Sequence, residues 1–334
     1  MSQSARSAKE QAEAIRGGDR KAMAKAITLL ESKRSEKADR GRAVLEELVP
    51  HAGQSMRVGV TGPPGVGKST FIESLGIYLL ERGHQVAVLA VDPSSPVTGG
   101  SILGDKTRME QLAQEAGAFI RPSPSGGSLG GVAERTREAM LVCEAAGYDV
   151  VIVETVGIGQ SEVSVRSMVD FFLVLLQPGA GDELQGIKKG VLELADSLVV
   201  NKADGAQLEA AERCAGEHAR ALGLLHARSA NWTPRVLMVS SLQRTGIDAV
   251  WEAILEHTAA LESSGEWQTR RKEQARQWMW SLVEEGLRSS FRAHPDVSSQ
   301  IDPLERAVQN LEVSPAAAAR ALLEAFRSRS LTHD

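Results

Sequence analysis

The chain has 334 residues, of which 42% are hydrophobic and 24% charged, a balance typical of globular proteins. Its formal net charge of -5 argues against general binding to nucleic acid or to an anionic membrane, since either would require a dominantly basic surface. Two cysteines, Cys143 and Cys214, exclude a disulfide framework and lack the spacing of a metal site.

The N-terminal residues lack the apolar core of a secretory signal, and no apolar run approaches the roughly 18 to 20 residues of a membrane span. A cytoplasmic enzyme or regulator is therefore expected. Residues 1–50 are predicted to form a helical extension, with a break at Gly17 and Gly18 and with Asp19 and Ser35 as helix caps.

From residue 56 onward, short apolar runs alternate with amphipathic stretches. Strands are predicted at 56–61, 85–91, 149–154, 170–175, 196–201 and 235–240. Valine, isoleucine and leucine fill them almost continuously, as in a sheet that is covered on both faces. Residues 51–262 are therefore predicted to form an α/β domain with a mostly parallel sheet.

Residues 263–334 are predicted to be helical. Apolar side chains recur there at helical spacing, at Ala275, Trp278, Met279, Leu282, Val283, Leu287 and Phe291. Such a stripe indicates either a helix packed on its own domain or a dimerisation arm. The second interpretation is the sharper one, because a long apolar face far from the sheet needs a partner surface.

A phosphate-binding pattern, "GPPGVGKS", lies between a predicted strand and a predicted helix. Glycines let the backbone N–H groups wrap an anion, and the helix N-terminus adds positive potential. The fold is thus predicted to be that of a P-loop NTPase, with Lys68 reaching the β- and γ-phosphates and the Ser69 hydroxyl binding Mg²⁺. The predicted contacts are Gly62, Pro63, Pro64, Gly65, Val66, Gly67, Lys68, Ser69 and Thr70.

The base is predicted from "NKAD", which follows the apolar run at 196–200. A carboxylate at Asp204 can accept both the ring N–H and the exocyclic amine of guanine, whereas adenine leaves it unpaired. The stem of Lys202 can lie over the base, and Asn201 can tie loops together. Ser241 and Leu242 follow the last strand, where backbone groups close over guanine.

Acidic residues that end two strands are candidates for the metal site. Glu154 is expected close to Mg²⁺, and Gly157, three residues later, is expected to contact the γ-phosphate. Asp92 ends the neighbouring strand and is followed by a polar loop that is suited to nucleotide sensing. Asp105 in that loop is a further metal candidate, with a solvated side chain as the alternative.

A second glycine-rich loop, "QPGAGDELQGIKKG", leaves the strand predicted at 170–175. Gln185 and Lys188 in this loop are catalytic candidates, together with Lys68. They would orient water or stabilise phosphate charge, and the alternative is contact with a partner protein or switching.

Together, "GPPGVGKST", "VDPSS", "ETVGIGQSE", "QPGAGDELQGIKKG" and "NKAD" resemble the MeaB/ArgK family of P-loop GTPases. The resemblance covers the central domain densely and extends to the flanking helices. It implies a GTP-dependent chaperone of methylmalonyl-CoA mutase, which helps to load adenosylcobalamin and to protect or reactivate the enzyme. It also implies a homodimer joined through C-terminal helices, and GTP hydrolysis that is slow alone and stimulated by the mutase.

Slow hydrolysis has a counterpart in the sequence, because Ile158 stands where well-known GTPases carry a water-orienting glutamine. The hypothesis is that partner docking completes the site. Two alternatives remain: an ATP-dependent kinase, which has no reason to carry "NKAD", and a nickel-centre maturation GTPase. The histidines are scattered and the two cysteines are widely separated, so nickel delivery is the weaker interpretation.

Overall fold

The computed structural model describes residues 3–32, 34–91, 109–122, 129–155, 161–179, 189–223 and 229–328. The chain divides into two compact units, residues 1–271 and residues 272–334. Within the described ranges, no helix is long and apolar enough to cross a membrane.

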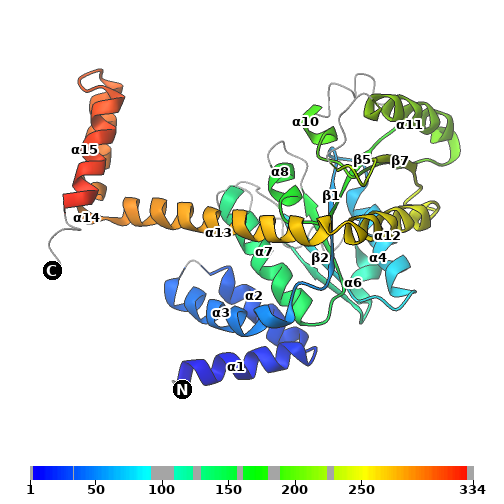
Figure 1. Cartoon of the computed structure of the whole chain (residues 1–334), viewed down its shortest axis with the longest axis horizontal. Helices are drawn as coiled ribbons and strands as arrows, with labels where there is room; N and C mark the ends of the chain where they lie inside the picture. The colour runs from blue at the N-terminus through cyan, green and yellow to red at the C-terminus, as the bar shows by residue number, and fades with distance from the viewer. Residues whose placement is uncertain are drawn as a thin grey trace. The chain divides into compact units, whose positions relative to one another are not determined.

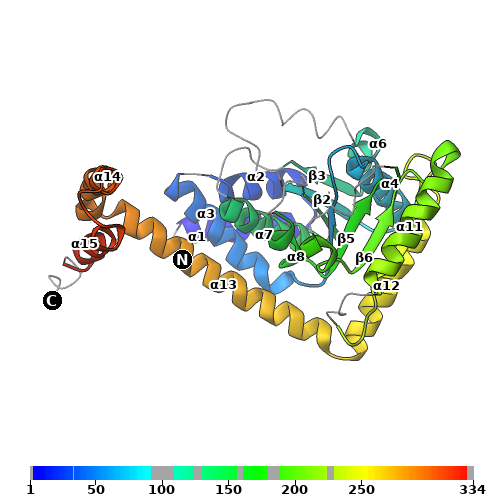
Figure 2. The same cartoon turned by 90° about the horizontal axis from the view of Figure 1, so that it is seen from above.

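The first unit is built on a parallel sheet in the order β3-β2-β4-β1-β5-β6-β7 (Figures 1 and 2). Its strands are β1 (Met56–Thr61), β2 (Val86–Val91), β3 (Ala118–Arg121), β4 (Val150–Thr155), β5 (Phe171–Leu176), β6 (Ser197–Val200) and β7 (Arg235–Met238). From β1 the chain forms β2, β3 and β4 on one side of β1 and then β5, β6 and β7 on the other side. The connections that leave the carboxyl ends of the central strands therefore run in opposite directions. Ligands of open α/β sheets bind at such a point.

Two apolar cores, one on each face of the sheet, explain its nearly continuous apolar strands. In β5, for example, Phe171, Leu173 and Leu175 pack with one core, and Phe172, Val174 and Leu176 pack with the other. The first core contains α4 (Lys68–Leu80), α6 (Glu110–Gln114) and α12 (Ile247–Ser263). The second contains α7 (Leu129–Ala145), α8 (Ser161–Arg166), α10 (Lys189–Leu192) and α11 (Leu208–Leu222).

Three N-terminal helices share the second core: α1 (Gln3–Arg16), α2 (Arg20–Leu30) and α3 (Ser35–Leu48). The Asp19 carboxylate caps α2 by accepting from the backbone N–H groups of Lys21 and Ala22, as predicted. The predicted cap at Ser35 is wrong, because Ser35 is already helical and Arg34 precedes it without a side-chain cap.

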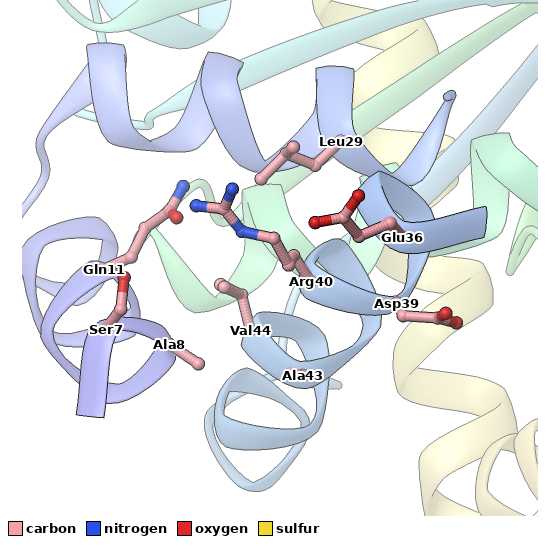
Figure 3. A pocket seen from close by; sticks show the side chains of 9 residues that line it. All are labelled: Ser7, Ala8, Gln11, Leu29, Glu36, Asp39, Arg40, Ala43 and Val44. Carbon is pink, nitrogen blue, oxygen red and sulfur yellow. The ribbon is translucent and has the colours of Figure 1, made fainter. Parts of the chain in front are cut away.

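A cavity of about 510 Å³ opens between α1, α2 and α3. Figure 3 shows the Arg40 side chain extending toward Gln11 across this hollow, with Val44 and Ala43 beneath it. The cavity is lined by residues of the N-terminal helices alone, so it is separate from the carboxyl ends of the strands, where the sequence motifs lie.

The predicted α/β class and parallel sheet are confirmed, and each of the six predicted strands overlaps an observed one. Strand β3 was not predicted. It has only four residues at the edge of the sheet and ends with Arg121, so it lacks the long apolar run that marks the other strands.

A buried charge network ties the start of α13 (Glu266–Ala293) to the amino ends of β1 and β5. The Arg271 guanidinium donates to both carboxylate oxygens of Asp170, at 2.7 and 2.5 Å, and to the carbonyls of Gly53 and Ser55. Nearby, Arg57 pairs with Glu144 at 2.6 Å. Burial by itself would lower the pKa of Arg57. The hydrogen bond to Glu144 and the negative charge of that carboxylate outweigh this effect, and the pKa of Arg57 is raised.

The second unit contains the rest of α13, α14 (Pro295–Gln309) and α15 (Pro315–Ser328). Within it, α14 and α15 pack together, and the Phe326 ring lies 5.3 Å from the rings of Phe291 and His294. No residue of α13 is buried within the described chain. Its apolar stripe is exposed, as at Met279 (49%), Trp280 (51%) and Leu287 (60%).

Candidate functional site

The loop of residues 62–67 joins β1 to α4 at the carboxyl edge of the sheet. Gly65 and Gly67 have φ values of +80° and +94°, a backbone region that favours glycine. Helix α4 begins directly after Gly67, which provides no side-chain cap for the N–H groups of its first turn. The arrangement is that of an anion-binding loop and helix N-terminus.

Lys68, in the first turn of α4, folds back over this loop. Its ammonium donates to the carbonyl oxygens of Gly62 at 2.8 Å and Pro63 at 3.1 Å. The positive charge is thereby held at the mouth of the loop, where a phosphate chain would lie.

A second cluster brings a hydroxyl and a carboxylate together beside the loop. The Ser69 hydroxyl donates to the Glu154 carboxylate at 3.3 Å, and Glu154 is only 8% exposed. Behind them, the buried hydroxyls of Thr61 and Thr155 join β1 to β4 at 2.6 Å. Hydroxyl and carboxylate oxygens are the donors that Mg²⁺ takes in nucleotide sites, so these residues fit that ion.

Asn201, immediately after β6, joins three segments. Its side-chain amide nitrogen donates to the Val66 carbonyl at 2.8 Å, and its oxygen accepts from the N–H and hydroxyl of Ser241, at 3.2 and 2.7 Å. The Ser74 hydroxyl of α4 donates to the Ser241 carbonyl at 2.6 Å. These hydrogen bonds therefore fix the position of the loop of residues 62–67 relative to the loop after β7.

The rest of "NKAD" lies at the same edge. The Asp204 carboxylate accepts from the Ser240 hydroxyl, and the Ala203 N–H donates to the Val239 carbonyl at 3.0 Å. Lys202 has a φ of +60°, and its ammonium donates to the Gly65 carbonyl at 2.8 Å. Leu242 is 83% exposed and its side chain projects from the loop after β7.

The structure thus brings together most of the residues predicted for the site: the loop of residues 62–67, Lys68, Ser69, Glu154, Asn201, Lys202, Asp204, Ser241 and Leu242. Thr70 lies beside them on an exposed face of the first turn of α4. Five further predicted residues, Asp92, Asp105, Gly157, Gln185 and Lys188, lie outside the described residues.

Sequence reasoning missed three contributors, namely Gln177, Ser74 and Ser240. Gln177 accepts from the Lys202 ammonium at 2.8 Å, and the other two contact Ser241 and Asp204. Gln177 opens the stretch "QPGAGDELQGIKKG", in which sequence reasoning identifies only Gln185 and Lys188 as candidates, whereas Ser74 is a single uncharged residue that no pattern marks. For Ser240, the available signal was its position at the end of a predicted strand.

This combination of parallel sheet, phosphate loop and base-recognition motif defines a GTPase of the P-loop class. A family model described as "Methylmalonyl Co-A mutase-associated GTPase MeaB" matches residues 23–296. The chain belongs to this MeaB family.

Individual relatives agree with the assignment. A Caulobacter vibrioides protein is 56% identical over 309 residues, which span 92% of this chain and 94% of that one. The "Methylmalonic aciduria type A homolog, mitochondrial" of Mus musculus is 45% identical over 322 residues, spanning 93% of this chain and 78% of that protein. A crystal structure named "LAO/AO transport system kinase" is 39% identical, with a TM-score of 0.77 and coverage of 98% and 99%.

Within the described residues, no three His, Cys, Asp or Glu side chains cluster closely enough to hold a metal ion by themselves. A cation beside Ser69 and Glu154 would therefore need further oxygen ligands, which nucleotide phosphates supply.

Replacing Gly67 by alanine is expected to weaken nucleotide binding by about tenfold or more, because the added Cβ would lie 2.7 Å from the Asn201 amide nitrogen and disturb its hydrogen bonds. Titration with a fluorescent GDP analogue measures the effect. Gly83→Ala is the matched control, since its φ of +87° imposes similar strain but no atom lies within 4 Å. Equal binding by the two variants would contradict the role given to Asn201.

Proposed function

We propose that this chain hydrolyses GTP to GDP and phosphate as a chaperone of methylmalonyl-CoA mutase, assisting the loading of adenosylcobalamin and the protection and reactivation of that enzyme. The supporting observation is the family match over residues 23–296, whose description names an association with the mutase. The name of the mouse relative, which refers to methylmalonic aciduria, points in the same direction.

In the proposed reaction, water attacks the γ-phosphate while the loop N–H groups and Lys68 stabilise the negative charge that develops. Mg²⁺, when bound, would neutralise charge on the β- and γ-phosphates, and Ser69 and Glu154 are the described residues that would hold it. Gln185 and Lys188 are proposed to complete the site when the mutase docks, and Asp92, Asp105 and Gly157 to contact metal or phosphate.

Guanine selection is assigned to Asp204, with the stem of Lys202 against the base and Asn201 holding the surrounding loops. The Ser240 hydroxyl that donates to Asp204 fixes the carboxylate, and Ser241 and Leu242 border the base site. A kinase that uses ATP would not require a carboxylate at residue 204. Substituting Asp204 therefore distinguishes a GTPase from the kinase activity that the name of the related crystal structure suggests.

Asp204→Asn is expected to weaken GTP binding by about 100-fold, because two charge-assisted hydrogen bonds to guanine are lost. The same variant should gain affinity for XTP, since the asparagine amide can donate to the 2-oxo group of xanthine. Competition titrations with GTP, XTP and ATP provide the measurement. Unchanged GTP binding together with tight ATP binding would favour the kinase alternative.

Adding adenosylcobalamin-dependent methylmalonyl-CoA mutase should accelerate GTP hydrolysis by about tenfold or more, because docking orders groups that position the attacking water. Phosphate release at saturating GTP, with and without the mutase, measures this. Substituting Gln185 or Lys188 should abolish the acceleration and spare GTP binding. If GTP turnover is slow and the mutase does not accelerate it, the chain is still a GTPase, but the proposal that the mutase is its client is wrong.

The region of residues 263–334 is proposed to form a homodimer through the exposed stripe of α13. Five large apolar side chains of that helix are exposed in the single chain, at Met279, Trp280, Leu282, Val283 and Leu287. A solvated monomer rarely displays such a face without a partner, and a second copy of the helix supplies a complementary one.

Leu287→Glu is expected to weaken self-association roughly 30-fold or more, because a carboxylate would be buried in an apolar interface. Sedimentation equilibrium of the full chain measures the dimer constant. Glu284→Ala, which removes an exposed charge from the same helix, serves as the control. A monomeric wild-type chain at micromolar concentration would overturn the dimer.

A further inference from the structure

The backbone of Lys202 has a conformation that is unfavourable for lysine. Its φ of +60° lies in the left-handed region, which costs an ordinary residue about 1 to 2 kcal/mol. The backbone on either side is fixed, since the Asn201 N–H donates to the Leu176 carbonyl and the Ala203 N–H donates to the Val239 carbonyl. Glycine or asparagine would suit this turn better, so the lysine side chain has a role that outweighs the strain.

Two acceptors from different loops hold the Lys202 ammonium. One is the Gly65 carbonyl of the phosphate loop at 2.8 Å, and the other is the side-chain oxygen of Gln177, also at 2.8 Å. A lysine side chain has four rotatable bonds and keeps most of its freedom when a single acceptor holds it. The second acceptor, from a separate element, fixes where the stem runs.

Gln177 is well placed for this task. It is the first residue after β5, a strand that pairs with β1 on one side and with β6 on the other. The loop of residues 62–67 follows β1, and "NKAD" follows β6, which lies beside β5 in Figure 2. The end of β5 also lies against the phosphate loop, because a Cβ on Gly62 would be 2.7 Å from the Leu175 carbonyl. Gln177 is half-buried, and the strand it follows is hydrogen-bonded to the strands that precede both motifs.

We propose that Gln177 is a positioning residue for guanine nucleotide binding: its amide oxygen holds the Lys202 ammonium against Gly65, which fixes the lysine stem where the base is bound. Gln177 touches neither base nor phosphate in this role and acts through Lys202. The inference rests on the proposed GTPase function, and it adds to guanine specificity a residue that lies outside both the phosphate loop and "NKAD".

Substituting Gln177 should therefore weaken nucleotide binding more than it slows the hydrolysis of bound GTP. Removing the acceptor frees the lysine stem before nucleotide binds, so part of the binding free energy is spent on ordering it again. The GTP-bound state reached afterwards is the same, so kcat should change little while KM rises.

The test compares two substitutions of Gln177 in the full chain. Gln177→Leu, which keeps the volume and removes the acceptor, should raise the Kd for a fluorescent GDP analogue about tenfold. Gln177→Glu should restore Kd to within about twofold of wild type, because a carboxylate accepts the same ammonium proton. Thermal unfolding of both variants establishes that they are folded.

A double substitution separates positioning from a merely structural effect. Lys202→Met keeps an apolar stem and removes the ammonium, so Gln177→Leu added to Lys202→Met should cause no further loss of GDP affinity. Additive losses, or equal Kd values for wild type and Gln177→Leu, would overturn the inference. Failure of the wild-type chain to prefer guanine over adenine nucleotides would instead contradict the proposed function.

Discussion

The buried side-chain amide of Asn201 is the contact on which the geometry of the site depends. It is 2% exposed, donates to the phosphate loop and accepts twice from Ser241, which joins segments 135 and 40 positions away in sequence. A buried amide that lost one of these partners would leave polar atoms unsatisfied on both sides. Asn201 therefore ties the loop of residues 62–67 to the loop after β7, and the close approach of Gly67 to the same amide explains why a side chain is excluded there.

The sheet makes this contact possible. Strands β5 and β6 lie between β1 and β7, so the loops after β1, β6 and β7 leave the same edge from separated positions. Two-sided burial of the central strands holds those positions, since β5 contributes alternate side chains to two cores. Asn201 can span the loops because the strands beneath them do not shift relative to one another.

Much of this arrangement could be predicted from sequence, where local chemistry dictates it. Continuous apolar runs identify strands buried on both faces, and glycines with a lysine and serine at fixed spacing identify the loop between β1 and α4. What could not be predicted depends on tertiary contacts. Arg271 and Asp170 pair across 101 positions, and the contact of Gln177 with Lys202 exists only because β5 and β6 are neighbours. Strand β3 forms by pairing with the edge of β2, and its own four residues carry too short a pattern to predict a strand.

The positive φ of Lys202 also bears on how this chain can change over time. Glycine at that position would relieve the backbone strain, yet it would remove the ammonium that reaches Gly65 and Gln177. Selection for a relaxed backbone alone would therefore work against this lysine. Backbone geometry and side-chain contacts thus make opposite demands on this one residue, and its identity is the compromise between them.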